Sequence, residues 1–327
     1  MKTLPESDNR TMLLTDRIHR NMFESILRGE FLPGQKFLTE QEAIDRYHAS
    51  RITIRRAFAL LEKDRIITRK TKTGSVVNNS FSASGGELHC IAAVVPLASH
   101  FVRTFLSTLC SEAAKRNIIT VLEPAADGKA QNEALIRLVT HGLRDIVLWG
   151  ADRDLDLDLC LRLRILGVNM TFFDQIAPGG IADYVCLDNQ EAIRTLLDKA
   201  AECSIKNIFF SDPDQRDVDT NKERKEFCRK ECGKRNWNFS SVLPDTLPPE
   251  SAIFAVNDEA AEKMLDRGVP VFSIDGLENS RRSGIISYRQ PMNELAVKCF
   301  HSLQQQRKLG SKWQARQYRL KNEEPFG

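Results

Sequence analysis

Apolar positions in residues 11–28 recur at helical spacing, with Leu14, Ile18, Met22 and Ile26 on one face. This pattern predicts a helix that Thr15 or a neighbour caps and that Gly29 ends. Pro33-Gly34 predicts a turn, and a second short helix is expected to open at Thr39-Glu40.

Ser50 begins a third predicted helix, with Ile54, Ala57, Phe58 and Leu61 on its apolar face. Two short β-prone runs follow, residues 66–69 and 75–77, and Lys70–Gly74 reads as the tip of a hairpin. The polar, glycine-ending residues 79–86 then predict a flexible linker and a domain boundary.

Beyond residue 87 short apolar strands alternate with helical stretches. Examples are residues 91–96, 119–124, 145–150, 168–173 and 183–187, each separated from the next by a helical or polar segment. This alternation predicts βαβ units with parallel sheets buried on both faces. About 240 residues of it suffice for two doubly wound lobes. We expect domains at 1–78 and 88–327, joined by a linker at 79–87, with lobe one at about 88–187 plus 289–320 and lobe two at about 188–288.

The net charge of +3 alone argues against a nucleic-acid partner, but its distribution changes this interpretation. Residues 1–78 carry 15 Lys and Arg against 10 Asp and Glu, whereas the remaining 249 residues carry 32 against 34. A basic N-terminal head on a slightly acidic body indicates a polyanion-binding module attached to a different unit.

The order of predicted elements in the head is that of a winged helix-turn-helix, whose third helix can enter the major groove of DNA. A solvated basic face is the alternative interpretation of that helix. The candidate DNA-binding residues are Thr39, Glu40, Ser50, Arg51, Thr53, Arg55, Arg56, Arg69, Lys70, Lys72 and Gly74.

Residues 13–78 resemble the gluconate-repressor (GntR) family of bacterial regulators. The resemblance rests on residues 26–29, Leu32–Lys36, Thr39-Glu40, Ala49–Ala57 and the wing segment through Arg69 and Gly74. It departs from the family at Leu38, Arg65 and Thr71-Lys72.

Residues 88–320 resemble the ligand-binding domain of the lactose-repressor family, which is like periplasmic sugar-binding proteins. The markers include Val94–Pro96, Asp174-Gln175, Leu187–Asn189, Ala255–Asp258 and Ile274–Gly276. The fold class expected is therefore α/β: a small winged helix-turn-helix domain followed by a two-lobed, periplasmic-binding-protein-like domain. Lactose-type repressors have a hinge helix in the linker that this sequence lacks, so a flexible tether is expected instead.

Ligands of open α/β sheets bind at the carboxyl ends of strands, where this chain carries carboxylates and amides that suit sugar hydroxyls. Helix capping is the alternative role for such side chains. The candidate ligand-binding residues are Ser99, His100, Phe101, Trp149, Asp174, Ser211, Asp212, Arg224, Asn257 and Asp275, with Arg224 placed by the resemblance, although Phe227 stands where the family usually has glycine.

These features favour a ligand-responsive transcription regulator that acts as a homodimer on operator DNA and senses a small sugar or sugar derivative. The resemblance implies that it is a repressor. A sugar-active α/β enzyme is the alternative, but neither a G-x-x-x-x-G-K-[ST] phosphate loop nor a G-x-S-x-G elbow occurs. A sugar-binding transport component would need a signal peptide, which the first thirty residues do not resemble. We expect a cytoplasmic protein that needs no cofactor.

No metal site is predicted either. The acidic run Asp152–Asp158 lacks the glycine and the final carboxylate of a calcium loop, and a helix start is expected there instead. The eight cysteines include no C-x-x-C pair and are expected to be free, mostly buried thiols, Cys228 and Cys232 included.

Overall fold

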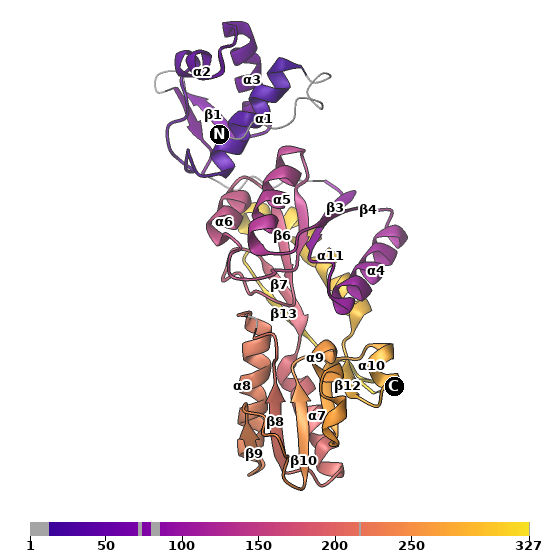
Figure 1. Ribbon diagram of the computed structural model, residues 1–327. Helices are drawn as coiled ribbons and strands as arrows, with labels where there is room; N and C mark the ends of the chain where they lie inside the picture. The colour runs from indigo at the N-terminus through magenta and orange to yellow at the C-terminus, as the bar shows by residue number, and fades with distance from the viewer. Residues whose placement is uncertain (1–12, 71–73, 80–85, 216, 327) are drawn as a thin grey trace.

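The chain folds into a small head above two stacked α/β lobes in the computed structural model (Figure 1). The structure describes residues 13–70, 74–79, 86–215 and 217–326. Three separate sheets organise it, with two strands in the head, six in lobe one and five in lobe two. All strand pairs of the two larger sheets are parallel.

The head contains three helices and a hairpin: α1 (Leu14–Leu27), α2 (Glu40–Tyr47), α3 (Arg51–Lys63), β1 (Ile67–Lys70) and β2 (Gly74–Val77). Leu13 precedes α1 without a side-chain cap, so the expected cap at Thr15 is not formed, and Gly29 follows the helix with a φ of 84°. The apolar faces predicted for the first and third helices pack together, and Met22, Ile26, Ile54 and Leu61 are fully buried.

Lobe one is built on the sheet order β13-β7-β6-β5-β3-β4. Its strands are β3 (Cys90–Val95), β4 (Ile119–Pro124), β5 (Asp145–Leu148), β6 (Asn169–Phe173), β7 (Asp183–Leu187) and β13 (Gln317–Leu320). Helices α4 (His100–Lys115) and α11 (Met292–Leu309) contribute to one buried cluster, and α5 (Gly128–Thr140) and α6 (Leu157–Ile165) contribute to another. The sheet is therefore covered on both faces, which explains its continuous apolar strands.

Lobe two is built on the sheet order β12-β11-β10-β8-β9. Its strands are β8 (Asn207–Ser211), β9 (Asn238–Ser240), β10 (Ser251–Ala255), β11 (Val271–Asp275) and β12 (Ile286–Arg289). Its helices are α7 (Asn189–Glu202), α8 (Asp219–Lys234), α9 (Asp258–Glu262), α10 (Glu278–Arg282) and the 3-10 turn η2 (Leu265–Arg267); a second such turn, η3 (Gly310–Lys312), precedes β13 in lobe one.

The chain passes between the lobes at three places: after β7, between β12 and α11, and after β13. The last of these brings the C-terminal segment back to lobe two, where Tyr288 Oη accepts a hydrogen bond from Asn322 N at 2.9 Å. These crossings place the carboxyl ends of both sheets toward a shared cleft.

The predicted fold class, a winged head followed by doubly wound parallel sheets, is confirmed. None of the helices in the described part of the chain is long and apolar enough to cross a membrane. All eight cysteines are free, and Cys160, Cys186, Cys228, Cys232 and Cys299 are buried. Burial raises the pKa of Cys160 to about 12, so this thiol stays protonated and unreactive.

Candidate functional site

The first candidate site is the exposed start of α3 in the head. Ser50 caps this helix, because its hydroxyl accepts a hydrogen bond from Thr53 N at 3.2 Å. Arg51, Arg55 and Arg56 are exposed on the face opposite the buried Ile54. This surface combines a helix N-terminus with three cations, which is what a phosphate backbone requires.

Glu40 joins three elements of this surface. Its carboxylate accepts from Arg55 Nε at 3.0 Å and from Arg69 Nη2 at 3.1 Å, and the Arg69 guanidinium also lies 5.5 Å from the centre of the Phe58 ring. Arg51 and Arg56 form no ion pair with a described residue. The structure therefore leaves Arg51 and Arg56 free to contact a ligand and holds Arg55 and Arg69 in fixed positions.

Thr39 opens α2 through a capping box with Glu42: Thr39 Oγ1 accepts from Glu42 N at 3.2 Å, and Thr39 N donates to Glu42 Oε2 at 2.7 Å. Thr39 Oγ1 also donates to Glu42 Oε2 at 2.8 Å, and the two hydrogen bonds donated by the Thr39 backbone and side chain lower the pKa of the Glu42 carboxyl. Lys70 and Gly74 are the last strand pair before the tip of the hairpin, whereas Lys72 lies outside the described residues.

Sequence reasoning missed Ile52, whose side chain is 65% exposed beside Arg51 on α3. A large apolar side chain on the exposed face of this helix is suited to contact a thymine methyl group in the major groove. The sequence did indicate this exposure, because Ile52 does not belong to the apolar stripe of Ile54, Ala57, Phe58 and Leu61 that packs into the core.

The second candidate site is a cleft between the lobes. Of the residues singled out from the sequence, the cleft brings together Ser99, Phe101, Trp149, Asp174, Asp212, Arg224, Asn257 and Asp275. His100 and Ser211 are not among its lining residues; His100 faces a neighbouring hollow near Gly276, and Ser211 ends β8. Four further residues line the cleft: Gln175, Asp214, Asn221 and Glu259.

These four lie next to residues that the sequence did suggest. Gln175 directly follows Asp174, and Asp214 is two residues after Asp212. Asn221 is one turn before Arg224 on α8, and Glu259, in the first turn of α9, is two residues after Asn257. The helical spacing of Asn221 and Arg224 could have identified the former.

Three buried polar atoms in the cleft, Asp174 Oδ1, Arg224 Nη2 and Trp149 Nε1, form no hydrogen bond of ordinary geometry with a described residue, although the Trp149 side chain lies close enough to Asp174 to favour its charged form. Arg224 Nη2 lies 3.9 Å from Asp174 Oδ1, while its Nε donates to Asn189 Oδ1 at 2.9 Å and its Nη1 donates to Val256 O at 2.7 Å. Buried polar groups are normally satisfied, so these atoms suit the hydroxyls of a polar ligand.

Two carboxylates of the cleft occupy unusual backbone positions. Asp174 has a φ of 63° and Asp275 a φ of 149°, and such conformations in residues other than glycine cluster at functional sites. Burial raises the pKa of Asp275, and the nearby Asp258 carboxylate adds to the effect. Burial likewise raises the pKa of Asp174, against the opposing influence of Arg224.

Asn257 has two roles in this geometry. It lines the cleft, and its side chain also caps α9 by accepting from Ala260 N at 2.8 Å. Asn257 therefore caps a helix, as expected of many polar residues at strand ends, and also lines the cleft.

The cleft is closed. Its free volume is about 30 Å³, and hydrogen bonds join its two sides. Asp219 at the start of α8 accepts from Ala177 N at 2.8 Å and donates from its own N to Gln175 O at 3.1 Å, and Glu259 accepts from His100 N at 2.8 Å. A pyranose can enter only when the lobes separate.

The described residues contain no group of three or more His, Cys, Asp or Glu side chains arranged to hold a metal ion. In the acidic run after β5, Asp156 caps α6 by accepting from Leu159 N at 2.9 Å.

A scan against protein-family models matches residues 14–77 to the bacterial regulatory proteins of the gntR family. No curated protein sequence matches the chain.

Solved structures resemble the part of the chain outside the head. A LacI transcriptional regulator from a Rhodococcus species has a TM-score of 0.61 at 18% identity, covering 71% of this chain and 95% of that one. A LacI family regulator CCPA from Weissella paramesenteroides with bound sucrose gives 0.60 at 13% identity, with coverages of 71% and 95%. The trehalose repressor from Escherichia coli gives 0.54 at 14%, with coverages of 72% and 98%.

At these identities the likeness establishes the fold of the body, whereas the head is identified by its own sequence match. Residues 14–77 form a helix-turn-helix domain of the gntR family, and the two lobes that follow have the fold of LacI-type transcription regulators.

Proposed function

We propose that the protein is a transcription regulator that binds operator DNA through its head and changes its DNA affinity when a small sugar or sugar derivative occupies the cleft. The observation that carries the proposal is the presence, in one chain, of a gntR-family head and a closed cleft lined by the buried side chains of Asp174, Arg224 and Trp149. Repression relieved by the ligand is the response we favour.

The exposed arginines at the start of α3 support the proposed DNA binding. Arg51 and Arg56 are exposed, and neither forms an ion pair with a described residue, so both can release counterions from a phosphate backbone without breaking an internal contact. Arg55 is paired with Glu40, so it can bind a phosphate only if this ion pair breaks or if Arg55 contacts Glu40 and the phosphate together.

Gel-shift titrations with a duplex selected from random sequence test this half. Arg51→Ala should weaken binding about 5- to 150-fold and, if Arg51 contacts a phosphate, reduce the salt slope by about one. Arg194→Ala, an exposed arginine on α7 paired with Glu191, is the matched control and should leave affinity unchanged. Unchanged affinity in both Arg51→Ala and Arg55→Ala contradicts the assignment.

The side chains that line the cleft support the proposed binding of a sugar. Carboxylates, amides and one guanidinium bind hydroxyls that both donate and accept, and the Phe101 and Trp149 rings offer apolar faces. A ligand present at 100 times its Kd would add about 2.7 kcal/mol of stability, which a thermal-shift screen of neutral mono- and disaccharides detects.

Asp275→Ala should abolish the binding of whichever sugar emerges from that screen while leaving DNA affinity intact. Calorimetry with the variant checks this assignment. If Asp275→Ala binds the sugar with wild-type affinity, Asp275 is not part of the binding site. If no sugar in the screen stabilises the protein, the ligand is not a sugar.

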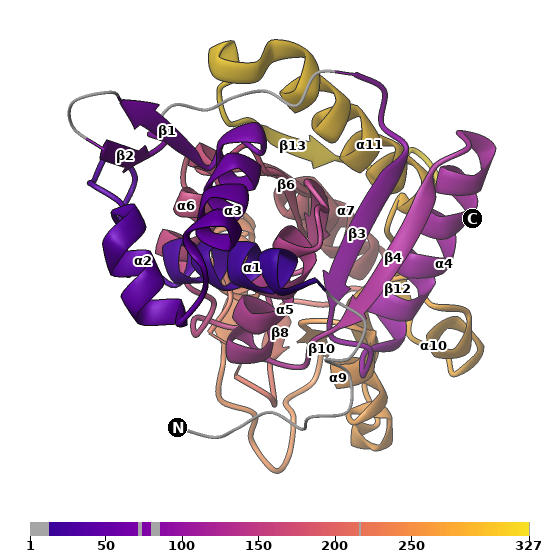
Figure 2. The same ribbon diagram turned by 90° about the horizontal axis from the view of Figure 1, so that it is seen from above.

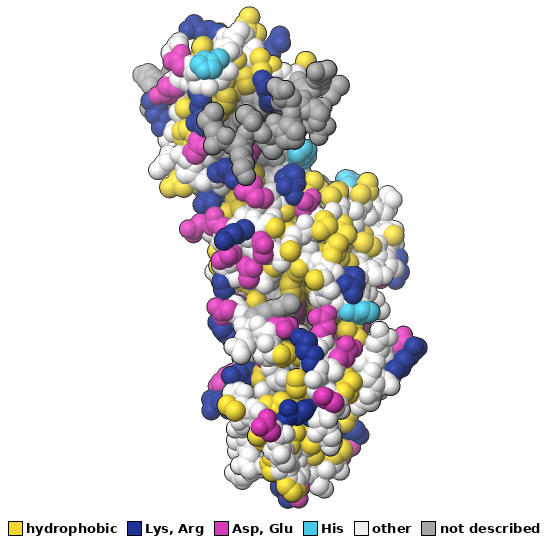
Figure 3. Space-filling view, in the orientation of Figure 1, with side chains coloured by type: hydrophobic (Ala, Val, Ile, Leu, Met, Phe, Trp, Pro, Cys, Tyr) yellow, Lys and Arg dark blue, Asp and Glu magenta, His cyan; other side chains and the backbone are white. Residues whose placement is uncertain are grey.

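We also propose that two copies pair, so that two heads can contact a pseudo-palindromic operator. Strand β4 lies at the edge of the lobe-one sheet, with Ile119 68% and Leu122 43% exposed, and hydrophobic side chains gather on this face (Figure 3). An exposed apolar edge strand is a natural pairing surface. Ile119→Lys should shift the sedimentation coefficient from dimer to monomer.

An enzymatic function is not favoured, because binding alone accounts for the groups that line the cleft.

A further inference from the structure

Helix α1 fastens the head to lobe one and lies between lobe one and α3 (Figures 1 and 2). Arg28, at the C-terminal end of α1, donates to both carboxylate oxygens of Glu133 on α5, at 2.8 and 2.7 Å. Arg162 on α6 donates its Nε to Leu27 O at 3.0 Å. Both helices that cover one face of lobe one therefore hold the last turn of α1.

The contact is also apolar. Phe23 on α1 is 2% exposed and has the Arg144 guanidinium 5.6 Å from its ring centre. Ile18, Met22 and Ile26 of the head belong to the same hydrophobic cluster as Leu159 and other buried side chains of lobe one. Because this burial excludes water, the head cannot rotate against lobe one without exposing apolar surface.

The same two helices also contact residues 149–156, here called the cleft segment because Trp149 at its start lines the cleft. Gln131 on α5 is fully buried, and its amide donates to Trp149 O at 2.7 Å and accepts from Ala151 N at 3.0 Å. Gln131 is two residues from Glu133, so one turn of α5 contacts both the cleft segment and the head.

Helix α6 repeats this arrangement. Asp156 caps α6 at the end of the cleft segment, and Asp156 Oδ2 pairs at 3.2 Å with Arg162, the residue that bonds Leu27 O. Helices α5 and α6 thus each form hydrogen bonds with the cleft segment and with the C-terminal end of α1.

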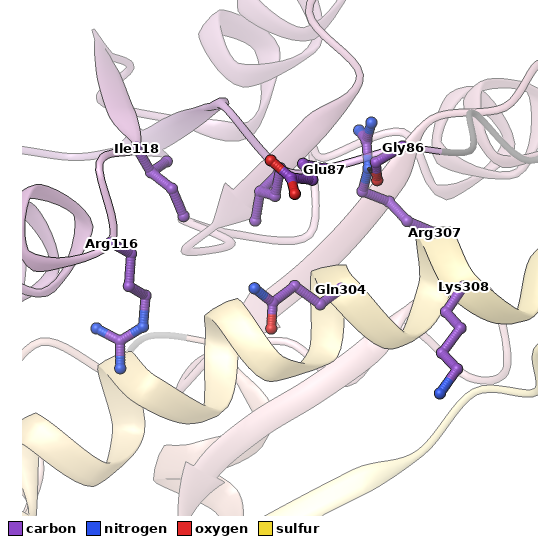
Figure 4. Close-up of a pocket in the computed structure, with 8 residues that line it drawn as sticks. Gly86, Glu87, Arg116, Ile118, Gln304, Arg307 and Lys308 are labelled. Carbon is purple, nitrogen blue, oxygen red and sulfur yellow. Dashed lines mark hydrogen bonds between the residues drawn. The ribbon is translucent and has the colours of Figure 1, made fainter.

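The described C-terminal end of the linker lies elsewhere on lobe one. This end, Gly86, is bound through its carbonyl by Arg307 Nε at 3.2 Å, beside a surface hollow lined by Arg116, Gln304 and Lys308 near the amino ends of β3 and β4 (Figure 4). Arg307 also pairs with Asp145 at 2.5 Å. The described linker end is therefore anchored to lobe one at the edge of the sheet away from the cleft.

We propose that the contact of α1 with α5 and α6, and not the linker, couples the cleft to the DNA-binding surface. This rests on the function proposed above. A ligand that moves the Trp149 segment shifts α5 and α6 through Gln131 and Asp156, and α1 carries the shift to α3, against which it packs. Coupling is reciprocal, so DNA bound at α3 must also alter the cleft segment.

Reciprocity provides a test that needs no sugar. Hydrogen exchange of residues 128–156 is measured by mass spectrometry in the full chain with and without a saturating duplex selected from random sequence. In the wild type, DNA should slow exchange in this segment about fivefold or more. Glu133→Arg/Arg162→Ala breaks both polar contacts and places Arg28 against a like charge, so the DNA-induced slowing should disappear.

Two controls complete the design. Arg137→Glu reverses a charge on the same helix, in a pair with Glu123 instead of the head, and should keep the slowing. A Gly-Ser insertion into residues 79–86 should keep it too. The proposal is overturned if the double variant retains the slowing, if the insertion abolishes it, or if the wild type binds DNA without it. Failure of the wild type to bind any duplex refutes the proposed function instead.

Discussion

Asp275 combines a position in the cleft with backbone strain, and the residue after it makes this possible. Gly276 has a φ of 69°, and a Cβ at this position would lie 2.2 Å from the Arg289 Cα atom. No L side chain fits so close to a backbone atom. The pair is thus held by the close packing of β11 against β12, and the strain at Asp275 is maintained by that packing.

Gly276→Ala should therefore destabilise lobe two by more than about 1 kcal/mol, because both the positive φ and the contact with Arg289 oppose the new methyl group. Denaturant unfolding measures the loss. Gly284→Ala is the matched control: it also has a positive φ, 85°, but its Cβ would meet nothing within 4 Å. Equal losses in the two variants would show that strain alone, without the close approach, governs this position.

The raised pKa of Asp275 gives a pH dependence with a definite sign. A folded-state pKa above the ordinary 3.8 means that the folded protein binds the proton more tightly than the unfolded chain. The contribution of Asp275 to stability is then present below the unfolded pKa and is lost as the pH rises through the folded pKa.

Asp275→Asn does not titrate, so its stability relative to wild type should improve as the pH is raised from acid to neutral. Unfolding free energies of the two proteins across this range check the prediction. A constant difference between them would mean that burial does not shift this carboxyl.

Among the secondary-structure elements, the apolar strands and the caps at Thr39 and Ser50 were predictable from the sequence, whereas the edge strands β9 and β13 were not. The buried strands β3, β5, β6 and β7 are continuous apolar segments that alternate with helices. Strand β13, with the sequence QYRL, is partly exposed along its length, and β9 is a three-residue edge strand. Both form because a neighbouring strand offers free backbone groups, which a local pattern does not encode.

The cap of α2 gives a prediction for an element. Thr39→Ala removes both side-chain contacts with Glu42 and should cost about 1 kcal/mol of head stability. Thr39→Ser keeps the capping hydroxyl and should remain near wild type. Thermal unfolding followed by far-UV circular dichroism separates the two variants, and equal melting temperatures would show that the capping box contributes nothing.

At the scale of the whole molecule, sequence reasoning identified the parts and missed how the head sits on the body. The flexible tether predicted for residues 79–86 lies mostly outside the described residues, and nothing in the sequence indicated that α1 is held against lobe one. Arg28 and Glu133 are 105 residues apart, and no local pattern predicts that these two side chains meet. The cleft was only partly predictable for the same reason: Asp214, in the loop after β8, and Glu259, in the first turn of α9, line the same cleft as Arg224 only because of the fold.

Residues 1–80 alone should bind operator only weakly compared with the full chain. The fragment loses lobe one, which orients α1, and the proposed pairing surface on β4, so each recognition helix binds without a partner. Fluorescence anisotropy with a labelled duplex compares the two. A fragment as tight as the full chain would show that the body adds neither orientation nor pairing.

The closed cleft also governs the time course of ligand recognition. With about 30 Å³ of free volume, the state described here does not admit a pyranose, and only molecules whose lobes have separated can bind one. The apparent dissociation constant is then the intrinsic value divided by the fraction of open molecules. In stopped-flow mixing the observed rate should reach a plateau at high sugar concentration, set by how often Asp219 releases the loop after β6.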